Sequence, residues 1–109
     1  MAEKDIIHTK VENQIALVTL NRPERLNAIN RATIQAIQKA FDNFESNNDV
    51  AVVIIRGSGR AFSAGMDLKD DAVAGISGKD GWQKVLSEDL DFLMRFWNFP
   101  KPTIAVAHG

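Results

Sequence analysis

The sequence lacks cysteine altogether and contains only two histidines. The absence of cysteine excludes a disulfide framework, a thiolate metal site and a cysteine nucleophile from this chain. His8 and His108 lie near opposite ends, so a histidine-rich metal site is not expected. No stretch approaches the roughly 18 consecutive apolar residues of a membrane span, and residues 1–10 are charged, unlike a secretory signal. We therefore expect a cytoplasmic protein with no metal and no membrane partner.

An excess of charge of either sign is also missing. The 109 residues include 13 basic and 14 acidic side chains, for a formal net charge of −1. The chain thus lacks the basic surface typical of nucleic-acid binding, and no nucleic-acid partner is expected. Hydrophobic residues make up 45% of the chain and charged residues 25%, as in an ordinary globular protein. A chain of this length forms one compact domain and not two.

Apolar patterns in the first half predict strands around a helix. Residues 6–11 and 15–20 are apolar runs across a short polar gap, which predicts a β-hairpin. Asn30 is a suitable N-cap for the helix that follows. Its apolar residues recur on one face: Ile34, Ile37, Phe41 and Phe44. The continuous apolar run 50–55 predicts a strand buried on both faces, as in a parallel sheet, reached by a right-handed crossover.

The second half predicts a loop, a helix and a last strand. Residues 70–81 combine glycines with polar residues, which indicates a loop. The next helix carries apolar residues at helical spacing, which predict its buried face: Leu86, Leu90, Leu93, Met94 and Trp97. After two prolines, residues 103–107 predict another buried strand. Because nothing in the sequence covers the edge of that strand, we expect more chain to follow Gly109.

The turn after residues 50–55 is the richest candidate for a site, since open α/β sheets bind ligands at the carboxyl ends of their strands. A dinucleotide fingerprint fails there because Phe62 occupies the third glycine position. A degenerate nucleophile elbow around Ser63 would need His8 or His108 as its base. A third interpretation is an oxyanion pocket, in which backbone amides around Gly65 and Met66 polarise a carbonyl. A plain connecting loop is the fourth.

Three sequence blocks resemble the enoyl-CoA hydratase/isomerase (crotonase) superfamily: LNRPERLNA (20–28), GRAFSAGMDL (59–68) and KPTIAVAHG (101–109). Their order and spacing match as well. The resemblance implies an α/β fold of repeated strand–strand–helix turns wound into a superhelical spiral, of which this chain is the N-terminal part. It also implies a CoA thioester as substrate, no further cofactor, and a homo-trimer or hexamer. The implied reaction is hydration, dehydration or isomerisation of a double bond conjugated to the thioester, as in fatty acid metabolism.

The resemblance also implies roles for particular residues. The backbone N–H of Met66 matches the first oxyanion-hole donor, and its side chain is expected either to line the acyl pocket or to pack. Ala64 matches the position whose carbonyl meets the adenine amine of CoA. The other matched substrate-binding positions are Arg25, Leu26, Asp67, Leu68 and Lys69. For Arg25 and Lys69 solvated surface charge is the alternative, and for Asp67 a structural role at the start of a helix.

The sequence departs from the family pattern at its end. The second oxyanion amide lies in a glycine-rich turn after the position of Gly109, and the acid/base glutamates come later still. Residues 1–109 are therefore expected to be part of a single crotonase-type domain, truncated before that turn, with no hydratase activity of their own. The alternatives are a non-catalytic acyl-CoA-binding or interaction module, and a serine hydrolase that uses Ser63. His108 is expected to pack or to support other residues.

Overall fold

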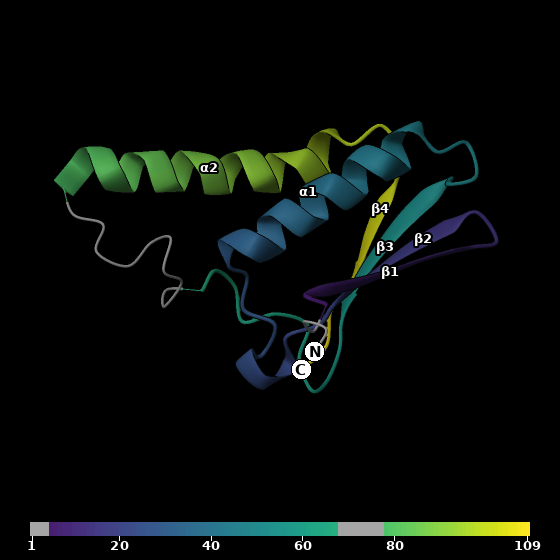
Figure 1. Cartoon of the computed structure of the whole chain (residues 1–109), viewed down its shortest axis with the longest axis horizontal. Helices are drawn as coiled ribbons and strands as arrows, with labels where there is room; N and C mark the ends of the chain where they lie inside the picture. Colours follow the sequence, from purple (N-terminus) through teal and green to yellow (C-terminus); the bar gives the residue numbers. More distant parts are fainter. Residues whose placement is uncertain (1–4, 68–77) are drawn as a thin grey trace.

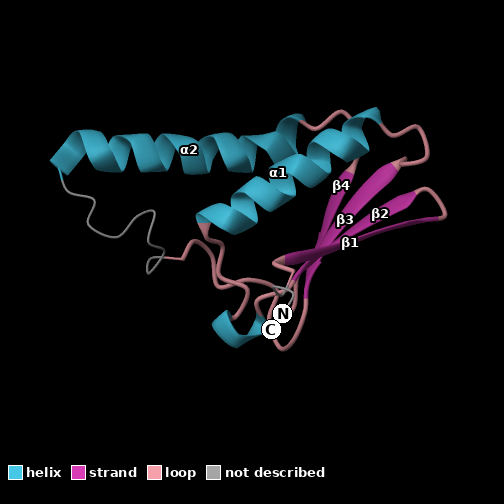
Figure 2. Cartoon of the chain, viewed as in Figure 1, coloured by secondary structure: helices cyan, strands magenta, loops and turns pink. Residues whose placement is uncertain are grey.

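The computed structural model describes residues 5–67 and 78–109. Four strands in the described residues form one sheet in the order β1-β2-β3-β4. Strand β1 is antiparallel to β2, whereas β2, β3 and β4 are mutually parallel. Both long helices lie on the same side of this sheet (Figures 1 and 2). The elements in order are β1 (Ile7–Glu12), β2 (Ile15–Leu20), the short 3-10 helix η1 (Pro23–Arg25), α1 (Arg31–Ser46), β3 (Val52–Gly57), α2 (Gly78–Asn98) and β4 (Thr103–Val106).

The predicted hairpin is confirmed. Strands β1 and β2 pair from Ile7 opposite Leu20 to Glu12 opposite Ile15. The two turn residues, Asn13 and Gln14, have φ values of 53° and 67°, as a type I′ turn requires. Alternate residues of β2 are buried: Ala16, Val18 and Leu20. One face of the sheet therefore joins the core, as the two-residue period of a strand demands.

The predicted helix α1 and its N-cap are also confirmed. The side chain of Asn30 accepts hydrogen bonds from the Thr33 backbone N–H at 2.8 Å and from the Thr33 hydroxyl at 2.7 Å. This satisfies one of the backbone donors that a helix start leaves free. The helix packs onto the inner face of β2 and β3 through buried side chains: Ile37, Ala40, Phe41 and Phe44. The apolar spacing of the sequence thus identified the buried face.

The predictions that residues 50–55 form a strand buried on both faces and that residues 103–107 form a buried strand are wrong for the described part of the chain. In β3, which begins at Val52, residues Val53 and Ile55 are buried and the alternate residues are not. Strand β4 is an edge strand, and Ile104 and Val106 are 49% and 48% exposed. The helices cover only one face of the sheet. The apolar residues of β3 and β4 on the other face are therefore not buried by the described residues.

The predicted buried face of α2 is wrong as well. Val85 and Phe92 are buried, whereas Trp97 is 82% exposed and the other predicted residues are exposed with it: Leu86, Leu90, Leu93 and Met94. The helix also begins at Gly78, so the predicted loop does not include residues 78–81, while residues 70–77 lie outside the described part. No helix in the described residues is long and apolar enough to cross a membrane.

Candidate functional site

Two loops leave the same edge of the sheet side by side. Leu20, the last residue of β2, pairs in parallel with Gly57, the last residue of β3. The first loop (residues 21–30) and the second loop (residues 58–67) therefore begin level with each other at the carboxyl ends of their strands. This is the edge at which open α/β sheets bind ligands.

Asn27 joins the two loops. The residue is 2% exposed, and its Oδ1 accepts a hydrogen bond from the Arg22 backbone N–H at 2.8 Å. Its Nδ2 donates to the carbonyl oxygens of Ser58 at 2.8 Å and Ala61 at 2.9 Å. A Cβ on Gly57 would come within 2.7 Å of this Nδ2, so the close approach of the loops requires glycine there.

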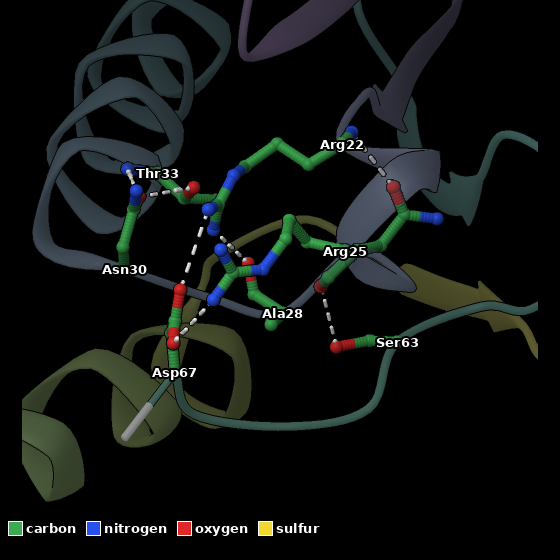
Figure 3. A network of polar contacts seen from close by, with 8 residues as sticks. Arg22, Arg25, Ala28, Asn30, Thr33, Ser63 and Asp67 are labelled. Atoms are coloured by element: carbon green, nitrogen blue, oxygen red, sulfur yellow. Dashed lines mark hydrogen bonds and ion pairs between the residues drawn. The ribbon is translucent and has the colours of Figure 1, made fainter. Parts of the chain in front are cut away.

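Ser63 and Ala64 add further contacts between the loops. The Ser63 hydroxyl donates to the Asn27 carbonyl oxygen at 2.9 Å and accepts from the Gly65 N–H at 3.0 Å. The Ala64 N–H donates to the Leu26 carbonyl oxygen at 2.9 Å. The hydroxyl of Ser63 is thus used to shape the second loop (Figure 3).

The histidines bond elsewhere, which leaves the serine-hydrolase interpretation without support. His8 Nε2 lies 2.9 Å from Asn21 Nδ2, and His108 Nε2 lies 3.0 Å from the Gly59 carbonyl oxygen. Neither ring contacts the hydroxyl of Ser63. Within residues 5–67 and 78–109, no histidine is placed to remove the Ser63 proton, as a serine nucleophile requires. For His108, the expected packing or supporting role agrees with its bond to the loop.

The peptide group between Gly65 and Met66 is fixed by a short parallel bridge. The Ile29 N–H donates to the Gly65 carbonyl oxygen at 2.8 Å, and the Asp67 N–H donates to the Ile29 carbonyl oxygen at 2.8 Å. The C=O and N–H of a trans peptide point in opposite directions. Because the Gly65 carbonyl points toward Ile29, the Met66 N–H points away from it. Among the described residues, none accepts a hydrogen bond from this N–H.

Gly65 is required by its backbone conformation. Its φ is +95°, and a Cβ built there would meet no atom within 4 Å. Space is therefore available for a side chain, but an L-residue with a β-carbon rarely adopts this conformation. The glycine allows the chain to turn so that its carbonyl faces Ile29.

An apolar hollow of about 190 Å³ adjoins Met66, between the start of α1 and the first half of α2. Its apolar lining includes Ile29, Ile34, Met66, Trp82 and Val85. Ligand pockets for drug-sized molecules usually measure about 300–1,000 Å³. The hollow therefore suits a short apolar group better than a whole nucleotide.

Asp67 is held by two arginines from the first loop. Its side chain is 7% exposed, and its Oδ2 lies 3.3 Å from Arg22 Nη2. Its Oδ1 lies 3.6 Å from Arg25 Nη2. Both guanidinium groups point toward this carboxylate (Figure 3). The carboxylate of Asp67 therefore serves to tie the second loop to the first.

The structure brings several of the predicted substrate-binding residues into these two loops. Ala64 is exposed, and its carbonyl oxygen accepts no hydrogen bond from any described residue. Arg25 is 45% exposed at its side chain, and Leu26 is half-buried. Leu68 and Lys69 lie outside the described residues. Arg22 and Asn27 were not predicted as site residues from the sequence, although both lie in the block 20–28.

The chain belongs to the enoyl-CoA hydratase/isomerase family, whose model matches residues 15–109. A similar curated protein is a probable peroxisomal enoyl-CoA hydratase 1 from Arabidopsis thaliana, 44% identical over 107 residues, which cover 97% of this chain and 38% of that protein. The mitochondrial Delta(3,5)-Delta(2,4)-dienoyl-CoA isomerase of Mus musculus is 32% identical, over 93% of this chain and 33% of that one.

Solved structures agree with the family and show the fold. An enoyl-CoA hydratase/isomerase from Xanthobacter autotrophicus Py2 superimposes with a TM-score of 0.90 at 43% identity, covering 98% of this chain and 40% of that one. The chain thus has the crotonase fold, in a portion that spans about two fifths of the length of this relative. Its α/β architecture agrees with the fold that the sequence blocks implied.

Proposed function

We propose that this chain supplies one half of an oxyanion hole for a CoA thioester, with the Met66 N–H as the donor. The observation that carries the proposal is the Gly65–Met66 peptide. Its carbonyl is bonded to Ile29 at 2.8 Å, and its N–H is left without an acceptor among the described residues. The similar proteins named as enoyl-CoA hydratase and dienoyl-CoA isomerase support the thioester as substrate.

The proposed chemistry follows from where charge develops. Attack on the conjugated double bond, or loss of a proton beside the carbonyl, places negative charge on the thioester oxygen. An N–H fixed about 2.8 Å from that oxygen stabilises the enolate more than the ground state, and loss of one such donor typically costs about 3–4 kcal/mol. The apolar hollow that Met66 lines supports the proposal that a short acyl chain is bound nearby.

The nucleotide part of CoA is proposed to lie along the second loop. Ala64 is exposed, and its carbonyl, which accepts no hydrogen bond from the described residues, would accept one from the adenine amine. Arg25 and Leu26 would flank the nucleotide from the first loop, and Asp67 would orient Arg25 through their ion pair. Leu68 and Lys69 complete the proposed set, with the Lys69 ammonium toward a phosphate.

The complete reaction is proposed to be hydration, dehydration or isomerisation of the conjugated double bond. The second oxyanion donor and the acid/base glutamates are proposed to come from residues outside this chain. No cofactor is proposed beyond the CoA thioester itself. The cytoplasmic location and the trimeric or hexameric assembly stay predictions, and relatives named as peroxisomal and mitochondrial show that the location varies in the family.

The first prediction concerns the donor itself. In an NMR titration of the chain, we expect butanoyl-CoA to shift the Met66 amide resonance, because the thioester oxygen accepts its hydrogen bond. Free CoA lacks that oxygen and is the matched control, expected to shift resonances of the two loops but not the Met66 amide. A Met66 resonance that moves with neither compound, or equally with both, would contradict the proposal.

A further inference from the structure

The guanidinium of Arg22 is shielded from water between the two loops. Its Nη1 donates to the Ala28 carbonyl oxygen at 2.6 Å, and its Nη2 contacts Asp67 Oδ2 at 3.3 Å. The side chains of Arg22 and Asp67 are only 17% and 7% exposed. Removing Asp67 would leave the shielded Arg22 charge without this ion pair, and removing Arg22 would take from Asp67 the more shielded of its two arginine partners. The pair therefore constrains the segments that carry it.

The two groups that Arg22 holds adjoin the bridge on either side. Ala28 precedes Ile29, and Asp67 follows Met66, so one guanidinium contacts both segments next to the Ile29–Met66 bridge. The planar guanidinium has donors at fixed separations. It therefore sets the spacing between the two segments just where their two backbone hydrogen bonds form.

We propose that Arg22 is a positioning residue for the Met66 N–H. Through its contacts with Ala28 and Asp67, Arg22 holds the Gly65 carbonyl against the Ile29 N–H. The Met66 N–H is at the opposite side of the same peptide group, so its direction is fixed as well. Arg22 itself touches no substrate in this scheme. The inference rests on the proposed function of Met66, but the geometry that it concerns exists without a ligand.

Arg25 is the weaker of the two contacts to Asp67. It lies 3.6 Å from the carboxylate, and its side chain is 45% exposed. Ion pairs open to water are screened and hold their partners loosely. Arg22 and Arg25 therefore differ in role. Arg22 contacts both loops from a shielded position, whereas Arg25 remains accessible at the surface.

The test, the second prediction, is amide hydrogen exchange of the 109-residue chain in the absence of any CoA compound. In Arg22→Gln and in Asp67→Asn, we expect exchange of the Ile29 and Asp67 amides to quicken by roughly 10- to 100-fold, as for loss of a hydrogen bond to a charged group. The Met66 amide resonance should shift in both variants. The double variant should add little to either single one, since the two residues act as a pair.

A matched control is Arg95→Gln. Arg95 is also partly shielded, at 25% exposed, and joins α2 to Gln38 and Asp42 of α1. Its loss should leave the exchange of the Ile29 and Asp67 amides at the wild-type rate. This separates the local effect of Arg22 from the general effect of deleting an arginine that bridges two elements.

Two outcomes would overturn the inference. Wild-type protection of Ile29 and Asp67 in both variants would show that the ion pair does not hold the bridge. An equal rise across the amides of β2 and β3 in both variants would show that the pair stabilises the whole fold and does not position Met66. The proposed function fails separately, if butanoyl-CoA leaves the wild-type Met66 amide unmoved.

Discussion

Asn27 shows how a single side chain can define the relation between two loops. Its φ of 54° lies in the left-handed region, which asparagine tolerates better than most residues. Its amide bonds to one backbone N–H and two backbone carbonyls, and the group is 2% exposed. A buried backbone N–H or C=O without a hydrogen-bond partner destabilises the folded state. Because water is excluded around Asn27, its three hydrogen bonds contribute to the stability of the fold.

The third prediction is that Asn27→Ala lowers the free energy of unfolding by about 3 kcal/mol, because three buried hydrogen bonds are lost at about 1 kcal/mol each. Urea unfolding of the chain measures this change. Asn43→Ala, at an exposed position of α1, is the control and should change stability by less than about 0.5 kcal/mol. Similar losses at the two positions would contradict the role given to Asn27.

Some residues of the candidate site were predicted from the sequence and others were not. Met66 and Ala64 were predicted because they lie in a recognisable motif after a strand. Asn27 was not predicted, because its partners Ser58 and Ala61 are distant in the sequence and contribute only backbone carbonyls. Arg22 likewise bonds to Asp67 across the two loops. No local pattern of residues reports contacts of that kind.

Helix α2 shows the limit of apolar spacing as a guide to burial. It has two apolar stripes, and the one that packs contains Val85 and Phe92. The ring of Phe92 lies 5.3 Å from that of Phe96, which in turn lies 4.9 Å from Phe41 of α1. Asp89 interrupts this stripe in the sequence, yet it is satisfied there by Arg31 at 3.1 Å. Tertiary packing, and not periodicity, decided which stripe is buried.

The fourth prediction tests this assignment of the faces. Phe92→Ala should lower the free energy of unfolding by about 3–5 kcal/mol, because it opens a cavity in the aromatic cluster. Leu90→Ala, on the stripe that is exposed (57% at Leu90), should change it by less than about 0.5 kcal/mol. Both are measured by urea unfolding, and the reverse order of losses would show that the opposite face packs.

Element types were therefore predictable where signals are local, and so was the buried face of α1, whereas the burial of α2, β3 and β4 was not. The hairpin, the Asn30 cap and the parallel crossover follow from turn residues, capping chemistry and apolar runs close together in the sequence. Whether β3 and β4 are covered on their second face depends on what lies beyond it. The described chain places both helices on one face only (Figure 2).

At the scale of the whole molecule, the chain covers about two fifths of the relatives that it matches. The glutamates of the two α-helices, Glu45 and Glu88, form ion pairs with Arg95 at 3.9 Å and with Arg31 at 3.5 Å. Neither is proposed to act on a substrate. We thus propose a division of roles: this chain supplies the first oxyanion donor, and residues outside it transfer the protons.

The fifth prediction follows from that division. Incubation of the purified chain with crotonyl-CoA should give no hydration above the rate without protein, because the groups proposed to move protons in general acid–base catalysis come from residues outside this chain. The measurement is loss of the absorbance of the conjugated double bond. Turnover above background would contradict the division, whereas binding of crotonyl-CoA without turnover agrees with it.

The pairing of β2 with β3 has one more consequence, which concerns length. Leu20 lies opposite Gly57. The register of the two strands therefore sets the relative positions of the two loops that follow them. A residue inserted within β3 would turn its inward side chains outward or advance the second loop by about 3.3 Å. Either change would separate Asn27, Arg22 and Ile29 of the first loop from their partners in the second loop at once, without altering any of these residues.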